Sequence, residues 1–79
     1  MDKLTLRAAA TYLRDNPGVA TPHHQFSGSQ MVGNLKYVVL RDGMAQVVAV
    51  YRVKQHPNRP NEYLRRLRQW PAALNPVTG

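Results

Sequence analysis

The longest apolar, β-branched run of this chain, broken once by a turn signal, constrains its fold more than any other feature. Residues 35 to 41 read LKYVVLR, residues 44 to 54 read MAQVVAVYRVK, and Asp42-Gly43 lies between them. β-branched and aromatic side chains favour strands because they pack well on a pleated surface. Asp-Gly suits a two-residue type I′ turn, since Gly43 adopts positive φ freely and Asp42 tolerates it. The sequence therefore predicts a β-hairpin over residues 35–54.

A two-residue turn would place Tyr37 opposite Val48 and Leu35 opposite Val50, although a longer loop around Gly43 would change this register. Both faces of such a hairpin are largely apolar, whereas a hairpin with one wet face alternates apolar and polar residues. We therefore expect a helix to cover one face, and another element or a second chain to cover the other. A homodimer through the hairpin is one form of that cover.

Residues 2–15, DKLTLRAAATYLRD, predict this helix. Asp2 or Thr5 can cap it, because a short side-chain oxygen accepts an orphan backbone N–H of the first turn. The Pro17-Gly18 step ends it, since a proline disfavours the α region at the residue before it. The apolar stripe expected to face the hairpin follows the i, i+3, i+4, i+7 spacing and consists of Leu6, Ala9, Ala10 and Leu13.

The remaining segments are shorter and more polar. Residues 17–34 have no clear period and predict an irregular loop, with a short strand near its end as an alternative. Residues 55–61, QHPNRPN, predict a linker. Residues 62–70, EYLRRLRQW, predict a short basic helix, and a third, edge strand is the alternative. Residues 71–79 predict a frayed tail in which Leu74 can still dock.

Together these elements predict a single domain of the α+β class over residues 1–79. Its N-terminal helix packs on a two- or three-stranded antiparallel sheet built on the hairpin at residues 35–54, and a short basic element follows. A chain of this length buries roughly 60% of the surface that its unfolded form exposes, so we expect a small core.

The charge of the chain is its clearest bulk property. Eleven Lys and Arg residues face four acids, which gives a formal net charge of +7 and a pI near 10.6. Eight of the eleven cations are arginines. A basic domain attracts polyanions such as nucleic acid or an acidic protein surface. The alternative is a basic protein that binds neither.

The Arg-rich C-terminal element holds the principal candidate binding residues. Guanidinium groups contact phosphate or carboxylate bidentately, and aromatic rings stack on bases. These candidates are Arg59, Tyr63, Arg65, Arg66, Arg68 and Trp70. Lys36, Arg41 and Arg52 extend the patch if their faces coincide. The alternative is a solvated helix face with Trp70 in the core.

Other chemistries find little support in the sequence. His23 and His24 are adjacent and therefore point in different directions, and the chain has no cysteine, so we expect no metal site. The glycine spacing from Gly28 to Gly33 lacks the lysine that a phosphate-binding P-loop requires, because Asn34 follows the second glycine. No paired carboxylates or cysteine nucleophile are available for catalysis. We therefore expect no enzyme activity, no cofactor and no small-molecule substrate.

The sequence also predicts a cytoplasmic protein with no membrane partner. No apolar run approaches the ~20 residues that span a bilayer, and MDKLTLRAAA lacks the long apolar core of a signal peptide. The absence of cysteine fits a reducing compartment.

From residue 35 to residue 71 the pattern KYVVLRDG, VVAVYRV and LRRLRQWP resembles small basic bacteriophage and prophage proteins of unknown function. In these proteins a Val-rich hairpin ends in a Tyr-Arg-Val triplet, here Tyr51 to Val53, and a Leu-Arg-rich tail ends in an aromatic residue and a proline, here Trp70-Pro71. The QHPNRPN insertion before the tail departs from that pattern, in which a tight turn stands at this place. The resemblance implies a phage-type accessory protein that acts on host or phage machinery.

Two functions follow as hypotheses. The first is a nucleic-acid-binding protein that contacts the RNA or DNA backbone through the Arg-rich element. The second is a phage-encoded effector that binds and inhibits a host complex, such as RNA polymerase or a defence system, through an acidic or nucleic-acid-binding surface of that target.

Overall fold

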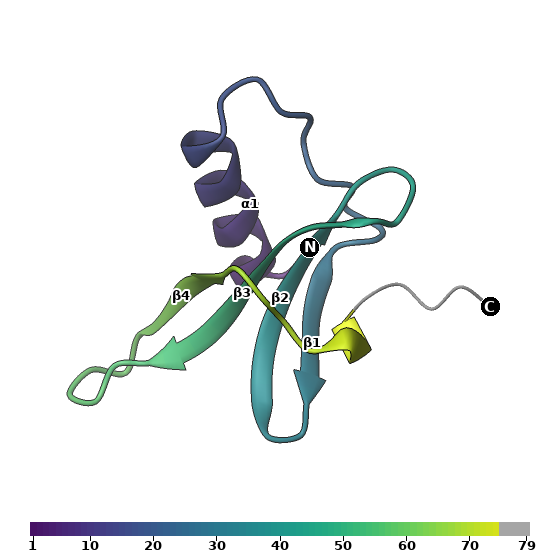
Figure 1. The fold of residues 1–79 in the computed structure, drawn as a ribbon. Coiled ribbons are helices and arrows are strands. Elements are labelled where there is room, and N and C mark those ends of the chain that lie inside the picture. The colour runs from purple at the N-terminus through teal and green to yellow at the C-terminus, as the bar shows by residue number, and fades with distance from the viewer. Residues whose placement is uncertain (75–79) are drawn as a thin grey trace.

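The computed structural model describes residues 1–74 and shows one helix against a four-stranded antiparallel sheet (Figure 1). The elements in chain order are α1 (Lys3–Asp15), β1 (Gly28–Val32), β2 (Leu35–Arg41), β3 (Val47–Gln55), β4 (Glu62–Leu67) and the short 3₁₀ turn η1 (Ala72–Leu74). Their order across the sheet, β1-β2-β3-β4, is also their order in the chain. The predicted α+β class is confirmed, with four strands in place of two or three.

Helix α1 begins where predicted, because the Asp2 carboxylate accepts the Thr5 backbone N–H at 2.7 Å and so caps the first turn. The predicted buried stripe is displaced by one residue. The side chains that face the sheet are Thr5, Ala8, Ala9 and Tyr12, whereas Leu6 is 56% exposed. The small side chains of Ala8 and Ala9 lie directly against the sheet, where a leucine would hold the helix farther off.

The hairpin of β2 and β3 forms with a register different from the predicted one. Val39 pairs with Val50 and Tyr37 pairs with Arg52, and a bulge shifts the register near Arg41. The turn is a longer loop over residues 42–46, because Asp42 Oδ1 accepts backbone N–H groups from both Met44 (2.9 Å) and Gln46 (3.0 Å). Ala45, with φ of 62°, supplies the positive φ in this loop.

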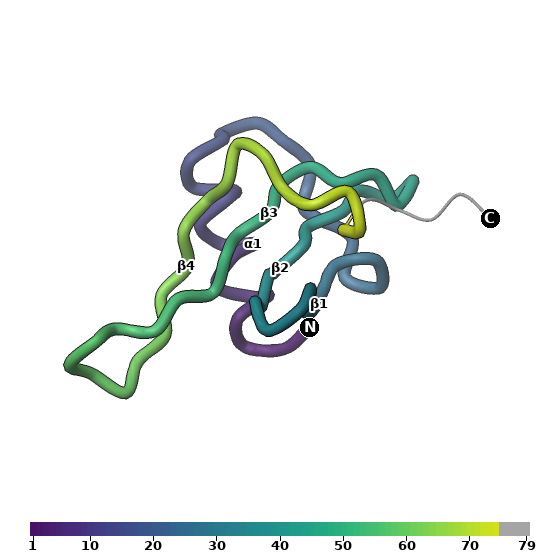
Figure 2. The backbone as a smooth tube through the Cα atoms, turned by 60° about the horizontal axis from the view of Figure 1, so that its bottom comes forward, coloured from purple at the N-terminus to yellow at the C-terminus, as the bar shows by residue number. Residues whose placement is uncertain are grey.

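Both faces of the sheet are covered, as the doubly apolar hairpin predicts. The helix-side core consists of Ala8, Ala9, Tyr12, Val38, Leu40, Ala49 and Tyr51. The second core, on the opposite face, consists of Tyr37, Val39, Val50 and Leu74, with Val32, Val47, Leu67 and Trp70 packed against it. After β4 the chain crosses this second face and forms η1 beside β1 (Figures 1 and 2). The chain itself thus supplies the second cover, and the homodimer stays a prediction.

The predicted basic helix at residues 62–70 is wrong, and the alternative, an edge strand, is confirmed. Glu62–Leu67 pairs along β3, with Leu64 opposite Val53 and Leu67 opposite Val50. Leu64 packs against the helix-side core and Leu67 against the second core. Apolar and polar residues do not alternate strictly along residues 62–70, and this lack of alternation favoured a helix. A strand is still compatible with the pattern, because Leu64 and Leu67 enter cores on opposite faces of the sheet.

Two further segments refine the predictions. The predicted irregular loop at residues 17–34 ends in strand β1, which corrects that prediction in favour of its alternative. Leu74 is fully buried within η1, whereas the rest of the predicted frayed tail, residues 75–79, lies outside the described residues. No helix within residues 1–74 combines the length and the apolar character needed to cross a bilayer.

Candidate nucleic-acid interface

Strand β4 presents arginines on both faces of the sheet. Successive residues of a strand point to opposite faces, and Arg66 lies opposite Tyr51 while Arg65 lies opposite Arg52. Tyr51 belongs to the helix-side core, so Arg66 emerges on the side of α1. Arg65 and Arg52 therefore emerge together on the face that holds the second core.

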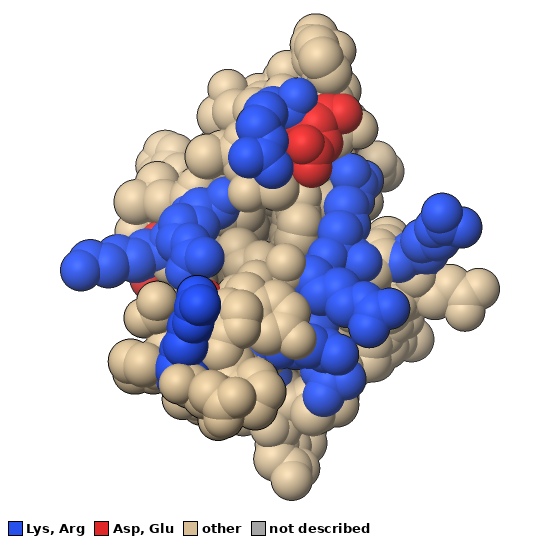
Figure 3. Space-filling model, turned by 90° about the vertical axis from the view of Figure 1, so that its left-hand side faces the viewer, with Lys and Arg blue, Asp and Glu red and all other residues tan. Residues whose placement is uncertain are grey.

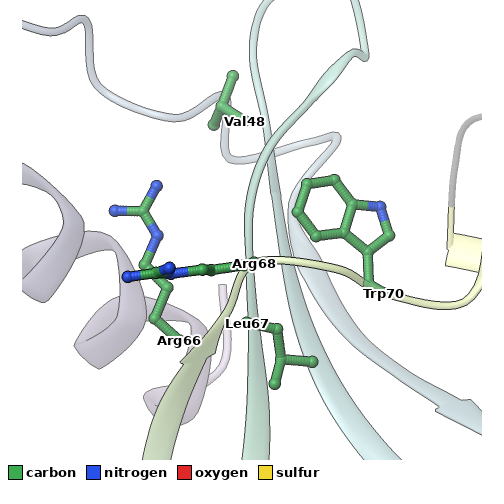
Figure 4. Close-up of a pocket in the computed structure, with 5 residues that line it drawn as sticks. All are labelled: Val48, Arg66, Leu67, Arg68 and Trp70. Carbon is green, nitrogen blue, oxygen red and sulfur yellow. The ribbon is translucent and has the colours of Figure 1, made fainter.

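A groove of about 570 Å³ opens where β4 ends. Its lining combines two arginines with apolar surface and consists of Val48, Arg66, Leu67, Arg68 and Trp70. In the view of Figure 4, the guanidinium groups of Arg66 and Arg68 both point to the side of α1, and the indole of Trp70 lies on the other side of the chain. Among the described residues that line this groove, none is acidic.

The helix fixes one of the two groove arginines. The Arg66 guanidinium carbon lies 5.5 Å from the centroid of the Tyr12 ring, within the range of a cation–π contact. The Tyr51 hydroxyl is buried without a hydrogen-bond partner among the described residues. Burial raises the pKa of Tyr51, so this phenol stays neutral at physiological pH. The surroundings of Arg66 thus orient its charge without neutralising it.

None of the four acids of the chain is among the described residues that line this groove. The Ser29 hydroxyl donates to Asp2 at 2.6 Å and, with Thr5, lowers the pKa of Asp2 to about 2. Asp42 organises its loop, Glu62 starts β4, and Asp15 pairs with Arg14 at 3.3 Å. That ion pair is the only one within residues 1–74. Several Lys and Arg side chains gather on the side of the molecule that faces the viewer in Figure 3, with a small acidic patch near its upper end.

Arg52 and Arg65 form a second cationic pair. They lie directly opposite one another on neighbouring strands, an arrangement that is destabilising for like charges. Arg52 Nε is buried and has no hydrogen-bond partner among residues 1–74. Next along the same face, Lys54 lies opposite Tyr63. An anion placed over this pair would offset its repulsion.

The structure does not gather all nine predicted site residues. Arg41 is tied to the fold, because its guanidinium donates to the carbonyl oxygens of Phe26 at 3.0 Å and Leu74 at 2.7 Å. Burial lowers the pKa of Arg41, although a guanidinium stays charged. Lys36 lies on β2 opposite Met31, away from β4.

The two candidates near the β3–β4 turn also lie apart from the groove. Arg59 is exposed within the turn itself, where its backbone N–H approaches the His56 carbonyl. The Tyr63 ring packs on the His56 ring with centroids 4.6 Å apart. The predicted residues that converge on the groove are therefore Arg66, Arg68 and Trp70, and Arg52 with Arg65 forms the separate pair.

Sequence reasoning missed the apolar part of the groove, Val48 and Leu67. Both residues fit an ordinary core pattern, and nothing local marks them as exposed to a ligand. They meet the arginines because the chain crosses the sheet after Leu67 and because the bulge after Leu40 leaves Val48 without a direct partner on β2. The arginine-aromatic composition gave the only available signal for this site.

Comparison of this chain with known proteins identifies no relative with a similar site. No protein-family model, no curated protein and no solved structure matches this chain.

Proposed function

We propose that this protein binds nucleic acid through the groove at the end of β4, with Arg66 and Arg68 on the phosphates. The supporting observation is the groove lining, which combines two guanidinium groups and an indole with apolar surface. Arginine contacts phosphate oxygens through paired N–H donors, and each contact is charge-assisted. The net charge of +7 adds long-range attraction for a polyanion.

The Arg52–Arg65 pair provides a second contact for the same ligand. Arg65 precedes Arg66 in β4, so the two arginine groups flank one strand from its two faces. A nucleic-acid strand that passes the β4 edge would meet both. Binding there would also offset the repulsion between Arg52 and Arg65, so that part of the affinity comes from relieved strain in the protein.

As part of the same proposal, the protein is a phage-type accessory protein of the bacterial cytoplasm that acts by binding and not by catalysis. The resemblance of residues 35–71 to small phage proteins supports this context.

Fluorescence anisotropy with labelled single-stranded RNA, single-stranded DNA and duplex DNA tests the proposal. We expect binding that weakens steeply with salt, because each phosphate contact releases counterions. The Arg66→Ala/Arg68→Ala variant should bind more weakly and lower the slope of log K against log salt by about 1.4 for single strands, at about 0.7 per contact. The matched control, Lys3→Ala/Arg14→Ala, removes the same charge from exposed positions of α1 and should keep most of the slope.

Equal losses in the two variants would show that net charge, not the groove, drives binding. Absence of binding near physiological salt would reject the nucleic-acid proposal. The hypothesis of an effector that binds an acidic protein surface would then be the one to test, by direct capture of a host complex on immobilised protein.

A further inference from the structure

The groove at the end of β4 is only partly cationic. Phosphates require donors and positive charge, which Arg66 and Arg68 supply, but they gain nothing from apolar surface. Val48, Leu67 and Trp70 supply such surface on the same groove. An occupant that matches the whole lining therefore carries a negative group and a flat apolar group side by side.

Trp70 is well placed to act as a fixed aromatic platform. The indole packs against the second core, and Pro71, whose ring fixes its own φ, follows it. Trp70 is half-buried, so part of the ring still lines the groove. Figure 4 shows the indole and the two guanidinium groups on opposite sides of the chain. Because all three side chains line one groove, a ring that stacks on Trp70 carries its attached phosphates in the same groove as the arginines.

The volume of the groove suits one such group. About 570 Å³ falls within the range of small-ligand sites, roughly 300–1,000 Å³. A nucleobase joined to its sugar and phosphate is the planar, anionic unit that nucleic acid offers. In a duplex the faces of the bases are stacked on their neighbours, whereas in a single strand they can splay out onto an aromatic side chain.

We infer that the groove holds one unstacked base of a single-stranded nucleic acid against Trp70, with its flanking phosphates on Arg66 and Arg68. This inference rests on the proposed function and names its substrate class. Stacking is tolerant of sequence because every base has a π-face, so single strands of different sequence should bind with similar affinity.

The chain offers a built-in probe, because Trp70 is its only tryptophan. The experiment titrates the wild-type protein with three probes of equal length: a single-stranded oligothymidine, the corresponding abasic phosphodiester and a duplex. Anisotropy reports affinity, and intrinsic fluorescence reports the surroundings of Trp70. We expect the oligothymidine to quench Trp70 and to bind about 5- to 150-fold more tightly than the abasic strand, the range found for stacking of one base. The duplex should leave the fluorescence nearly unchanged.

Two variants localise the effect. Trp70→Leu keeps an apolar side chain on the second core but removes the aromatic face, and should bind the oligothymidine and the abasic strand about equally. Trp70→Phe should keep part of the preference. Urea unfolding of each variant checks that it is folded, and the wild-type comparison holds even if Trp70→Leu is not.

The outcomes separate this inference from the proposal beneath it. Equal binding of base-bearing and abasic strands, both weakened by Arg66→Ala/Arg68→Ala, would overturn the base pocket and leave phosphate binding intact. Tighter binding of the duplex would also overturn the pocket. Failure of all three probes to bind would overturn both.

Discussion

The two ends of the sheet use the same polar chemistry in opposite ways. Near β1 and β2 the polar side chains find partners within the fold: Ser29 donates to Asp2, and Arg41 donates to two carbonyl oxygens. At β4 and just beyond it, the side chains of Arg65 and Arg68 make no hydrogen bond or ion pair with any described residue. Residue type therefore does not distinguish a structural arginine from one left available for a ligand. Its hydrogen-bond partners do.

The largest expected effect tests whether stability lies in the centre of the sheet. Leu40 on β2 is fully buried in the helix-side core, so Leu40→Ala should lower the free energy of unfolding by about 2–5 kcal/mol. The matched control is Leu6→Ala on α1, where the leucine is 56% exposed. It should change stability by less than about 0.5 kcal/mol. Urea unfolding measures both, and a large loss for Leu6→Ala would restore the helix stripe predicted from the sequence.

A smaller effect separates the two kinds of arginine directly. Arg41→Ala removes charge-assisted hydrogen bonds to Phe26 and Leu74, and should lower the free energy of unfolding by about 1.5–3 kcal/mol. Arg68→Ala removes an exposed side chain and should stay within about 0.5 kcal/mol of wild type. Equal destabilisation by the two substitutions, in the same urea series, would erase the distinction between the two ends of the sheet.

The Asp2 cap makes the β1 end sensitive to acid. The folded pKa of about 2 lies below the ordinary value of 3.8, so the carboxylate stabilises the fold above about pH 4 and loses that contribution as the pH falls towards 2. Asp2→Ala should cost about 0.5–2 kcal/mol at neutral pH. The gap between wild type and variant should close near pH 2. A gap that persists there would assign the loss to something other than the charged cap, and Asp15→Ala, at an exposed ion pair, serves as control.

The smallest expected effect tests the repulsion between Arg52 and Arg65. Arg65→Glu would place opposite charges across β3 and β4 and should raise the free energy of unfolding by about 0.2–1 kcal/mol. Arg65→Gln removes only the repulsion and should fall between wild type and Arg65→Glu. Added salt should shrink both gains, because exposed charges are screened. Loss of stability in both variants would mean that Arg65 contributes to the fold instead of straining it.

Sequence reasoning predicted the elements better than their details. The helix, a cap at either Asp2 or Thr5, the hairpin and the need for two covers all follow from local composition and patterning. The hairpin register could not be predicted in this way. The Asp42 side chain accepts hydrogen bonds from the backbone N–H groups of Met44 and Gln46, so the loop is longer than an Asp-Gly turn. The spacing of Leu64 and Leu67 suits one helical face, and equally suits a strand between two cores. Only the tertiary structure decides between them.

The candidate site, like the fold, could be predicted from the sequence only in part. Composition was enough to propose Arg66, Arg68 and Trp70 among nine candidate residues, but not to single them out. It could not show that Arg41 is consumed by hydrogen bonds to a segment 33 residues later in the chain. Nor could it show that Val48 completes the groove, since that depends on how the chain crosses the sheet after β4.

The central claim is that the arginines of the β4 end serve a nucleic-acid ligand while Arg41 serves the fold. One paired measurement tests it most directly: the free energy of unfolding and the affinity for a single-stranded oligonucleotide, each for wild type, Arg41→Ala and Arg66→Ala/Arg68→Ala. We predict that Arg41→Ala loses stability and, where it remains folded, keeps its affinity. We predict that Arg66→Ala/Arg68→Ala loses affinity and keeps most of its stability. The reverse pattern, or parallel losses in both variants, would contradict the claim.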